Sequence, residues 1–514
     1  MGKKFLIFVF LIAFASPAIS QKTQGDISEI KANLEHLASD ELEGRETLTN
    51  GEYLASEYIA QKFKEYGVMP FGDNGTYFQN FPLIVSKFTP DSHVKISSTD
   101  GSVTPFNFKT DFIIDARRIP DKQFTGTRSD LVFAGFGITA PEFGYDDYAD
   151  IDVTGKTVFV LDDEPLSKDS NYFRGDRATQ YSFWGTKWRI ARSKGASGLV
   201  IIATPGTMER WEALGEWGSG EAIRYPSNES NASNDRIPVI CITPDMAKKL
   251  LSGEKFEYDS VNELFLASKE VPVFNLNKMI SFELNVEEEE KMSRNVVGII
   301  EGNDPVLKNE YVSIGAHYDH EGIKNGEIYN GADDNASGTV AVMEVGRKLV
   351  PLKKNGRSVV LMLYSGEEKG LMGSRYLSEN SDYVKDFIAN INMDMVGRMS
   401  EDTLQTIGSR RLSTQLGDLV EEANKETSNF VLDYTYDAPD DPNRFYERSD
   451  HYNFAKQGIP VVFFFDSMDD DYHKPTDDAH KINYEKIFKV VNMVEALTLK
   501  LSNLDSRLKI DNQN

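Results

Sequence analysis

Five short polar motifs follow apolar runs in the C-terminal half of the chain, and each contains a side chain that could bind a metal ion. They are GAHYD with His317, NGADDNASG with Asp334, SGEE with Glu368, NMDM with Asp394 and DYHKPTDD with His473. Two histidines and three carboxylates are ligand types that suit zinc and other divalent first-row metals. Each residue taken singly has an ordinary structural interpretation, but together they predict a metal-dependent site.

His317 ends the apolar segment YVSIGAH, and Asp319 lies two residues further on. In an extended segment, positions i and i+2 share a face, so Asp319 could accept the second ring N–H of His317 and hold its tautomer. His320, directly after this pair, is an alternative ligand.

The segment around Asp334 has two interpretations. Its glycines allow close approach of the backbone, and Asp333, Asp334 or Asn335 could serve only as N-cap residues of the helix expected beyond them. A carboxylate here could instead bridge two ions, because the lone pairs of its two oxygens point apart.

Glu367 and Glu368 follow another apolar run. Adjacent carboxylates repel, and burial raises the pKa of at least one of them unless a cation neutralises the pair. We therefore predict one metal ligand and one free general base, with a solvent-exposed turn as the alternative. Asp394 ends an apolar strand, where a charge without a partner is unfavourable.

The elements that must position these residues are continuous apolar runs, which predict strands buried on both faces. The runs are Val296–Ile300, Val312–Ala316, Val359–Tyr364, Ile388–Met393 and Val461–Phe465. Amphipathic helical patterns separate them, so we predict an α/β domain with a mixed, mostly parallel central sheet flanked by helices. Ligands gather at the carboxyl ends of strands in such sheets, where the motifs are found.

The N-terminal half has patterns of its own. Apolar residues recur at helical spacing in two stretches between Ile27 and Tyr66, and Gly67 is placed as a C-cap. Short apolar strands and a helical stretch follow between Leu131 and Ser268. There the sequences VTGKTVFVLDDEP and KWRIARSKGASGLVII resemble the protease-associated domain, a small β-rich insert of secreted peptidases. An unrelated α/β insertion is the alternative.

The first twenty residues have the order of a secretory signal, with two lysines, an apolar run from Phe5 to Ala15 and small residues before Gln21. This run is short for a membrane span of about 20 residues, so we expect a secreted or periplasmic protein without a span in its mature form. The expected layout is a signal peptide at 1–20, an N-terminal part of the peptidase domain at 21–127, the insert at 128–268 and the catalytic domain at 269–514.

The formal net charge of −25 argues against a nucleic-acid or anionic-membrane partner, since both require basic patches. The single cysteine, Cys241, cannot form an internal disulfide.

In their order along the chain, the five motifs resemble those of the secreted zinc aminopeptidases related to bacterial leucyl aminopeptidase and glutamate carboxypeptidase II. The resemblance covers roughly Lys31 to Leu499 and implies two zinc ions per chain. The implied ligands are His317 and Asp394 for one ion, Glu368 and His473 for the other, and Asp334 for both.

The resemblance also implies roles for neighbouring residues. Glu367 would be the general base, Asp319 the residue that orients a ligand, and Tyr472 the donor of a hydrogen bond to the tetrahedral oxyanion. A simple packing role for Tyr472 is the alternative. The family often has a cis peptide bond after the bridging aspartate, here Asp334–Asn335.

The segment ERSDHYNF contains Ser449, Asp450 and His451, which are too close along one helix start to form a serine-hydrolase triad. The resemblance instead implies that Asp450 and His451 are supporting or substrate-pocket residues, with Arg448 as a further substrate contact.

The function predicted from the sequence is that of a co-catalytic two-zinc aminopeptidase, which would hydrolyse the N-terminal peptide bond of peptide substrates. The alternatives are a peptidase of the glutamate carboxypeptidase type, a single-zinc glutaminyl cyclase, and a non-catalytic binding protein on a peptidase scaffold. No pattern predicts an oligomeric state.

Overall fold

The computed structural model describes residues 17–512 apart from 90, 115–122, 126–128, 170, 174, 176–177, 213, 216–221, 227–236, 399, 440 and 442. The chain divides into two compact units. Unit 1 comprises Met1–Phe81 and Met292–Asn514, and unit 2 comprises Pro82–Lys291. Of the signal peptide expected at 1–20, residues 1–16 lie outside the described part of the chain.

Unit 1 is built on a mixed sheet in the strand order β1–β14–β18–β15–β19–β22–β20–β21. The strands β18, β15, β19 and β22 run parallel to one another, whereas β14 pairs antiparallel with β18 and β20 pairs antiparallel with β22. Their bounds are β1 (Met69–Pro70), β14 (Val273–Ile300), β15 (Tyr311–His317), β18 (Ser358–Tyr364), β19 (Phe387–Asp394), β20 (Thr403–Ile407), β21 (Val431–Asp433) and β22 (Val461–Phe465). The predicted mixed, mostly parallel sheet is therefore confirmed.

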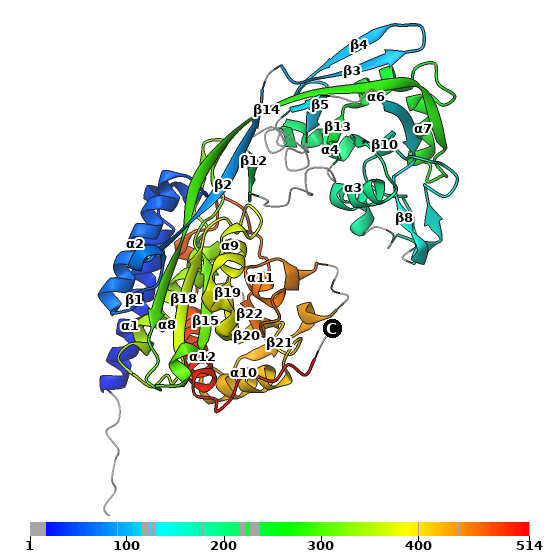
Figure 1. Cartoon of the computed structure of the whole chain (residues 1–514). Helices are drawn as coiled ribbons and strands as arrows, with labels where there is room; N and C mark the ends of the chain where they lie inside the picture. Colours follow the sequence, from blue (N-terminus) through cyan, green and yellow to red (C-terminus); the bar gives the residue numbers. More distant parts are fainter. Residues whose placement is uncertain are drawn as a thin grey trace, which may run out of the picture. The chain divides into compact units, whose positions relative to one another are not determined.

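Helices cover both faces of this sheet (Figure 1). Successive residues of β18 alternate between two cores: Leu361 packs with α8 and α12, while Met362 packs with α9 and α11. The helices of the first face are α1 (Pro17–Leu37), α2 (Asn50–Tyr66), α8 (Gly338–Leu349), α10 (Thr414–Thr427) and α12 (Tyr484–Ser502). Those of the second are α9 (Met372–Asn380) and α11 (His451–Ala455). As predicted, α2 ends at Gly67, whose φ is +81° and whose N–H bonds to the carbonyl of Phe63.

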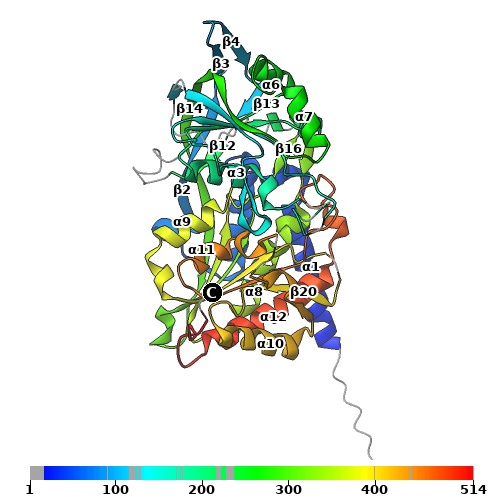
Figure 2. The same cartoon turned by 90° about the vertical axis from the view of Figure 1, so that its right-hand side faces the viewer.

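Unit 2 contains a second mixed sheet, with α3 (Trp184–Ser193) and α6 (Pro244–Leu251) among its helices (Figure 2). The strand order is β5–β13–β11–β10–β7–β14–β3–β4, and β6 also pairs with β14. The other elements of the unit are β3 (His93–Ser98), β4 (Val103–Asn107), β5 (Phe112–Ile114), β6 (Gln123–Thr125), β7 (Ser129–Ala134), β8 (Thr139–Ala140), β9 (Tyr145–Asp146), β10 (Thr157–Leu161), β11 (Gly198–Ile202), α4 (Pro205–Glu209), β12 (Ala222–Arg224), β13 (Val239–Ile242) and α7 (Tyr258–Leu266). Strand β2 (Phe78–Phe88) pairs with β12 and β14.

Unit 2 is wider than the insert expected at 128–268. It begins at Pro82 and ends at Lys291, because β3 and the first half of β14 pair with the sheet that contains β7. The acidic run Glu287–Glu290 lies inside the continuous strand β14.

Each unit has cores made only of its own residues. The core around β15 and α8 draws on residues from 30 to 68 and from 296 to 508, whereas the two cores around β10 and β11 use residues from 88 to 284. Among the described helices, none is both long and apolar enough to span a bilayer.

Candidate metal centre

The five motif residues lie at one edge of the unit 1 sheet. His317 is the last residue of β15 and Asp394 the last of β19, while Glu368 and His473 follow β18 and β22. Asp334 lies in the turn before α8. Because the carboxyl ends of parallel strands meet at the same edge, residues far apart in the sequence converge there.

Asp334 lies between two groups of ligand-type side chains. Its Oδ1 is 3.4 Å from Nε2 of His317, and its Oδ2 is 3.1 Å from Nε2 of His473. His317 Nε2 is also 3.2 Å from an oxygen of Asp394. On the other side, His473 Nε2 is 3.2 Å from an oxygen of Glu368. One carboxylate thus has each of its oxygens directed at a different half of the site.

The charge of this site requires a cation. Asp334, Glu368 and Asp394 are all buried, and buried carboxylates must be paired with positive charge. Burial and Asp334 raise the pKa of Glu368, but hydrogen bonds from His320 and His473 outweigh them and hold it at about 2. Although burial opposes it, contacts with Asp334 and Glu368 raise the pKa of His473 to about 10. The neighbouring carboxylates thus favour a positive charge on His473, and a divalent cation held by the same donor set would supply positive charge in its place.

Glu367 is next to this set, and its carboxylate lies close to His317 and Asp394. Its Oε2 is 3.9 Å from Nε2 of His317, and its side chain lines the pocket beside the ligand-type residues. Burial raises the pKa of Glu367 well above its usual value, and the charges of Glu368 and Asp394 raise it further, against the opposing effect of His317. A carboxyl group with a raised pKa is suited to exchange a proton.

Asp319 differs from the expectation. Nδ1 of His317 lies 3.1 Å from the backbone carbonyl oxygen of Asp319 and 3.8 Å from its carboxylate. Strand β15 ends at His317, so the two side chains do not share the face of an extended segment. The Asp319 carboxylate instead accepts the hydroxyl of Thr47 at 2.8 Å and the backbone N–H of Glu367 at 3.2 Å, which places it behind Glu367.

His320, the alternative ligand, lies behind Glu368. Its Nδ1 is 2.9 Å from Glu368 Oε1 and 3.9 Å from Asp334 Oδ2. Glu321 was not predicted as part of the site, yet its carboxylate lies 3.5 Å from Nδ1 of His473. A carboxylate at the second nitrogen of a ligand histidine fixes the tautomer of the ring.

The pocket in front of these residues also has apolar side chains in its wall. It is lined by Met395, Phe445, Phe463, Phe465 and Met468 together with Arg448 and Tyr472. The ring of Tyr472 stacks on His473 with 3.9 Å between centroids, and its hydroxyl lies 3.5 Å from Nη2 of Arg448.

The structure brings Arg448 to the pocket but not Asp450 or His451. Both are fully buried beneath it, and His451 stacks on Phe463. Ser449, which we considered only as part of a serine-hydrolase set, donates its hydroxyl to Asp394 Oδ2 at 2.8 Å.

Arg45 is a further residue that the sequence did not reveal. Its buried guanidinium donates to the carbonyl oxygens of Leu37, Tyr318, Asn330 and Gly331. It thereby joins the N-terminal segment to the loops that carry His317 and Asp334. Its partners are remote in the sequence, so no local pattern marks it. The peptide bond Asp334–Asn335 is cis.

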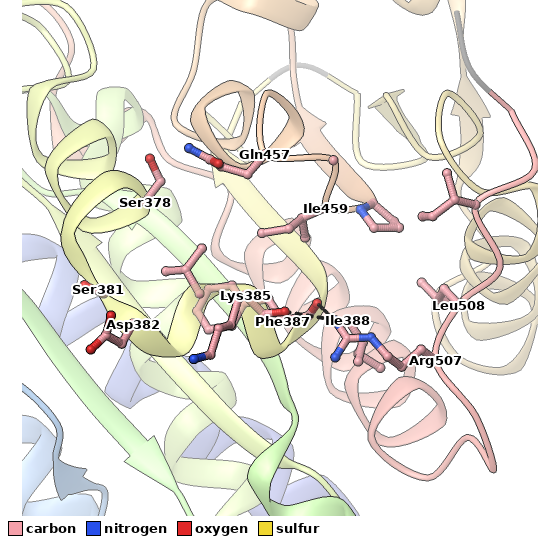
Figure 3. Close-up of a pocket in the computed structure, with 14 residues that line it drawn as sticks. Ser378, Ser381, Asp382, Lys385, Phe387, Ile388, Gln457, Ile459, Arg507 and Leu508 are labelled. Carbon is pink, nitrogen blue, oxygen red and sulfur yellow. Dashed lines mark hydrogen bonds between the residues drawn. The ribbon is translucent and has the colours of Figure 1, made fainter.

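A second pocket lies at the opposite ends of β19 and β22, between α9 and the C-terminal segment (Figure 3). Arg507 reaches into it and donates to the carbonyl oxygens of Lys385 and Phe387. No histidine lines this pocket, so it does not repeat the ligand types of the first.

Together, the α/β sheet and the histidines and carboxylates at its strand ends define an α/β protein with a candidate metal centre. Residues 295–498 match the model of peptidase family M28.

The chain is similar to several named proteins. It is 27% identical to a probable leucine aminopeptidase of Trichophyton verrucosum, over 38% of this chain and 56% of that protein. It is 29% identical to leucine aminopeptidase 1 of Sclerotinia sclerotiorum, over 38% of this chain and 54% of that protein. The match thus spans about half the length of these relatives. The structure of an aminopeptidase from Aneurinibacillus sp. strain AM-1 has the same fold, with a TM-score of 0.56 and 21% identity over 96% of this chain and 98% of that one.

Proposed function

We propose that this chain is a co-catalytic two-zinc aminopeptidase that removes the N-terminal residue of peptides. The observation that carries the proposal is the placement of Asp334, whose two oxygens face His317 and His473 in separate halves of one site. A carboxylate with this placement is suited to bridge two ions. Its relatives named as leucine aminopeptidases support the exopeptidase activity.

Five side chains would hold the ions. His317 and Asp394 would bind one, Glu368 and His473 the other, and Asp334 both. Imidazole and carboxylate groups suit zinc, which when bound supplies Lewis-acid activation of a water molecule and of the scissile carbonyl group.

Glu367 would act as the general base. It lines the pocket beside the ligands, and the raised pKa of its carboxyl group favours accepting a proton from water. The same group would then donate that proton to the leaving amine. Asp319 would hold Glu367 in place through the Glu367 N–H.

Tyr472 and Arg448 would act on the substrate itself. Burial raises the pKa of Tyr472, so its phenol remains a hydrogen-bond donor, and the hydroxyl is directed toward Arg448 at the pocket wall. A donor there could stabilise the negative charge that develops on the carbonyl oxygen.

The proposal extends to the rest of the chain. We infer that unit 2 is a protease-associated domain and that the protein is secreted or periplasmic, which the sequence of residues 1–20 supports. A single-zinc cyclase is disfavoured because Asp334 has ligand-type residues on both sides, His317 with Asp394 and His473 with Glu368.

The test is hydrolysis of a chromogenic leucyl substrate by the full chain. We expect activity that a chelator abolishes and zinc restores, and a kcat that Glu367→Gln lowers about 100- to 10,000-fold, because general acid–base catalysis contributes that much. Glu379→Gln changes an exposed glutamate of α9 and is the matched control. Unchanged kcat in Glu367→Gln would refute the mechanism.

Two further measurements separate the alternatives. Elemental analysis should find about two zinc ions per chain, whereas a cyclase needs one. An N-acetylated peptide should resist the enzyme, because acetylation blocks the free amine that only an aminopeptidase requires. Hydrolysis of the acetylated peptide from its C-terminal end would favour a carboxypeptidase.

A further inference from the structure

Asp477 lies in the same loop as His473 and accepts hydrogen bonds from the backbone of residues 332–334. Its buried carboxylate accepts the N–H of Asp333 at 3.0 and 2.9 Å and the N–H of Asp334 at 3.0 Å. Its own carbonyl oxygen accepts the N–H of Ala332 at 3.1 Å. Three successive N–H groups therefore end on one residue. Because a side chain follows its backbone, this contact determines where the two oxygens of Asp334 point.

Arg398 connects Asp477 to the rest of the site. Its Nη2 donates to Asp477 Oδ1 at 2.7 Å, and its Nη1 donates to Asp471 Oδ2 at 3.0 Å. Its backbone N–H donates to Asp466 Oδ2 at 2.9 Å. Arg398 lies in the loop that begins at Asp394, so one guanidinium joins that loop to the loop of His473.

The third connection joins the loop of Asp394 to the loop of Asp334. The successive N–H groups of residues 395, 396 and 397 donate to Asn335 Oδ1 at 3.1 Å, Ser337 Oγ at 3.0 Å and Asp333 Oδ1 at 2.7 Å. The loops 332–337, 394–398 and 466–477 are thus tied pairwise, and each carries one of the proposed ligands. We call this arrangement the loop triangle.

The ion pair in the loop triangle is buried, with side chains 9% exposed for Arg398 and 3% for Asp477. Buried ion pairs lose hydration, so they contribute little net stability compared with apolar residues of the same volume. Asp477 also accepts backbone N–H groups next to a proposed metal ligand. Loss of residues that orient ligands lowers metal affinity about 10- to 100-fold, so we expect this pair to affect metal affinity more than stability.

We propose that Asp477 and Arg398 are positioning residues for Asp334. They hold the Asp334 backbone so that its carboxylate can be shared by the two halves of the metal centre. This inference rests on the metal centre of the proposed function but not on its substrate. Neither residue touches the reacting atoms. Their effect is exerted through the backbone of residues 332–334.

The test uses Zn²⁺ binding to the metal-free full chain, measured by competition with a chromogenic chelator. Asp477→Asn keeps the shape of the side chain but replaces one acceptor oxygen by a donor, so it cannot accept from both Arg398, which donates to Oδ1, and the N–H of Asp334, which donates to Oδ2. We expect the dissociation constant for Zn²⁺ to rise about 10- to 100-fold. Arg398→Lys, which keeps the charge without the fork of donors, should show a smaller rise.

Glu310→Gln is the matched control. Its carboxylate pairs with Arg357 at 2.8 Å, next to the amino ends of β15 and β18, away from the strand ends that carry the site. Its Zn²⁺ affinity should equal that of the wild type.

The absorption spectrum of the Co²⁺-loaded protein gives a readout that lost stability alone would not move, because it reports ligand geometry. We expect the Co²⁺ bands of Asp477→Asn to change and those of Glu310→Gln to match the wild type. A folded Asp477→Asn with wild-type Zn²⁺ affinity and Co²⁺ bands would overturn the proposal. If Asp477→Asn does not fold, wild-type values in Arg398→Lys and Arg398→Gln would overturn it equally.

The outcome for the proposed function is separate. A wild-type chain that binds two Zn²⁺ ions but cleaves no aminoacyl substrate would refute the proposed aminopeptidase activity. The Zn²⁺ affinities of the Asp477 and Arg398 variants would still test the positioning role. A wild-type chain that binds no Zn²⁺ would overturn both.

Discussion

Gly331 is packed so closely at the start of the Asp334 loop that it has no space for a side chain. A β-carbon there would collide with the carbonyl oxygen of Asp334 and with the ring of His320, and its φ is +56°. The same residue accepts a hydrogen bond from Arg45. The glycines of the NGADDNASG motif therefore allow the close backbone approach that we predicted from the sequence.

Gly331→Ala should lower both the stability and the Zn²⁺ affinity of the protein. Gly326→Ala is the control, because Gly326 also has a positive φ, +79°, but has open space around its β-carbon position. The control should cost about 1–2 kcal/mol of unfolding free energy from its backbone conformation alone. Gly331→Ala should cost more and raise the dissociation constant for Zn²⁺. Equal unfolding free energies and affinities for the two variants would contradict this interpretation.

His451 should make stability depend on pH. Burial lowers its pKa to about 3, whereas an unfolded histidine titrates near pH 6.5. As the pH falls from about 6.5 to 3, only the unfolded chain takes up this proton, so stability is lost by about 1.4 kcal/mol per pH unit. His451→Phe keeps a ring against Phe463 and removes the titration.

Between pH 7 and pH 5, His451→Phe should therefore lose about 2 kcal/mol less unfolding free energy than the wild type. Urea unfolding at both pH values measures this difference. His480→Phe, at an exposed histidine, should leave the wild-type dependence unchanged. An identical loss in His451→Phe and the wild type would show that His451 does not titrate in this range.

At the scale of elements, the strands of the unit 1 sheet could be predicted because their burial on both faces leaves continuous apolar runs. His317, Glu368 and Asp394 could be placed because they end those runs or follow them within a few residues. The orientation of Asp319 could not be predicted, since it depends on the end of β15 at His317 and on Thr47, which is remote in the sequence. Arg45 and Asp477 were not singled out for the same reason: their partners are backbone groups that only the tertiary fold brings near.

The boundaries of the insert could not be predicted from composition. Strand β14 continues from Val273 to Ile300 and pairs in both sheets, so its sequence shows no break where unit 2 ends. The pattern of residues 93–107 is equally typical of either unit, and only the pairing of β3 with β14 assigns it to unit 2.

At the scale of the whole molecule, separate cores predict that unit 1 folds without unit 2. Val297 donates its N–H to the carbonyl oxygen of Tyr77 at 2.7 Å, and β2 pairs with β14. Phe81 and Met292 therefore lie on paired strands, and a short glycine–serine linker can join them. A chain with 82–291 replaced by this linker should bind Zn²⁺ with the stoichiometry of the full chain, as measured by elemental analysis, and show a cooperative thermal transition. A deletion variant that is folded but binds no Zn²⁺ would show that unit 2 is needed for the metal centre.

The contacts of Arg45 and Asp477 also determine when the site is completed during synthesis. Arg45 holds the backbone at Tyr318 and Gly331, and Asp477 holds the backbone at Asp334, so the site uses residues that are synthesised early in unit 1 and residues that are synthesised late. A nascent chain that still lacks His473 and Asp477 has neither the second half of the centre nor a fixed bridging carboxylate. The proposed peptidase would therefore remain inactive on the ribosome until the last loops of unit 1 emerge.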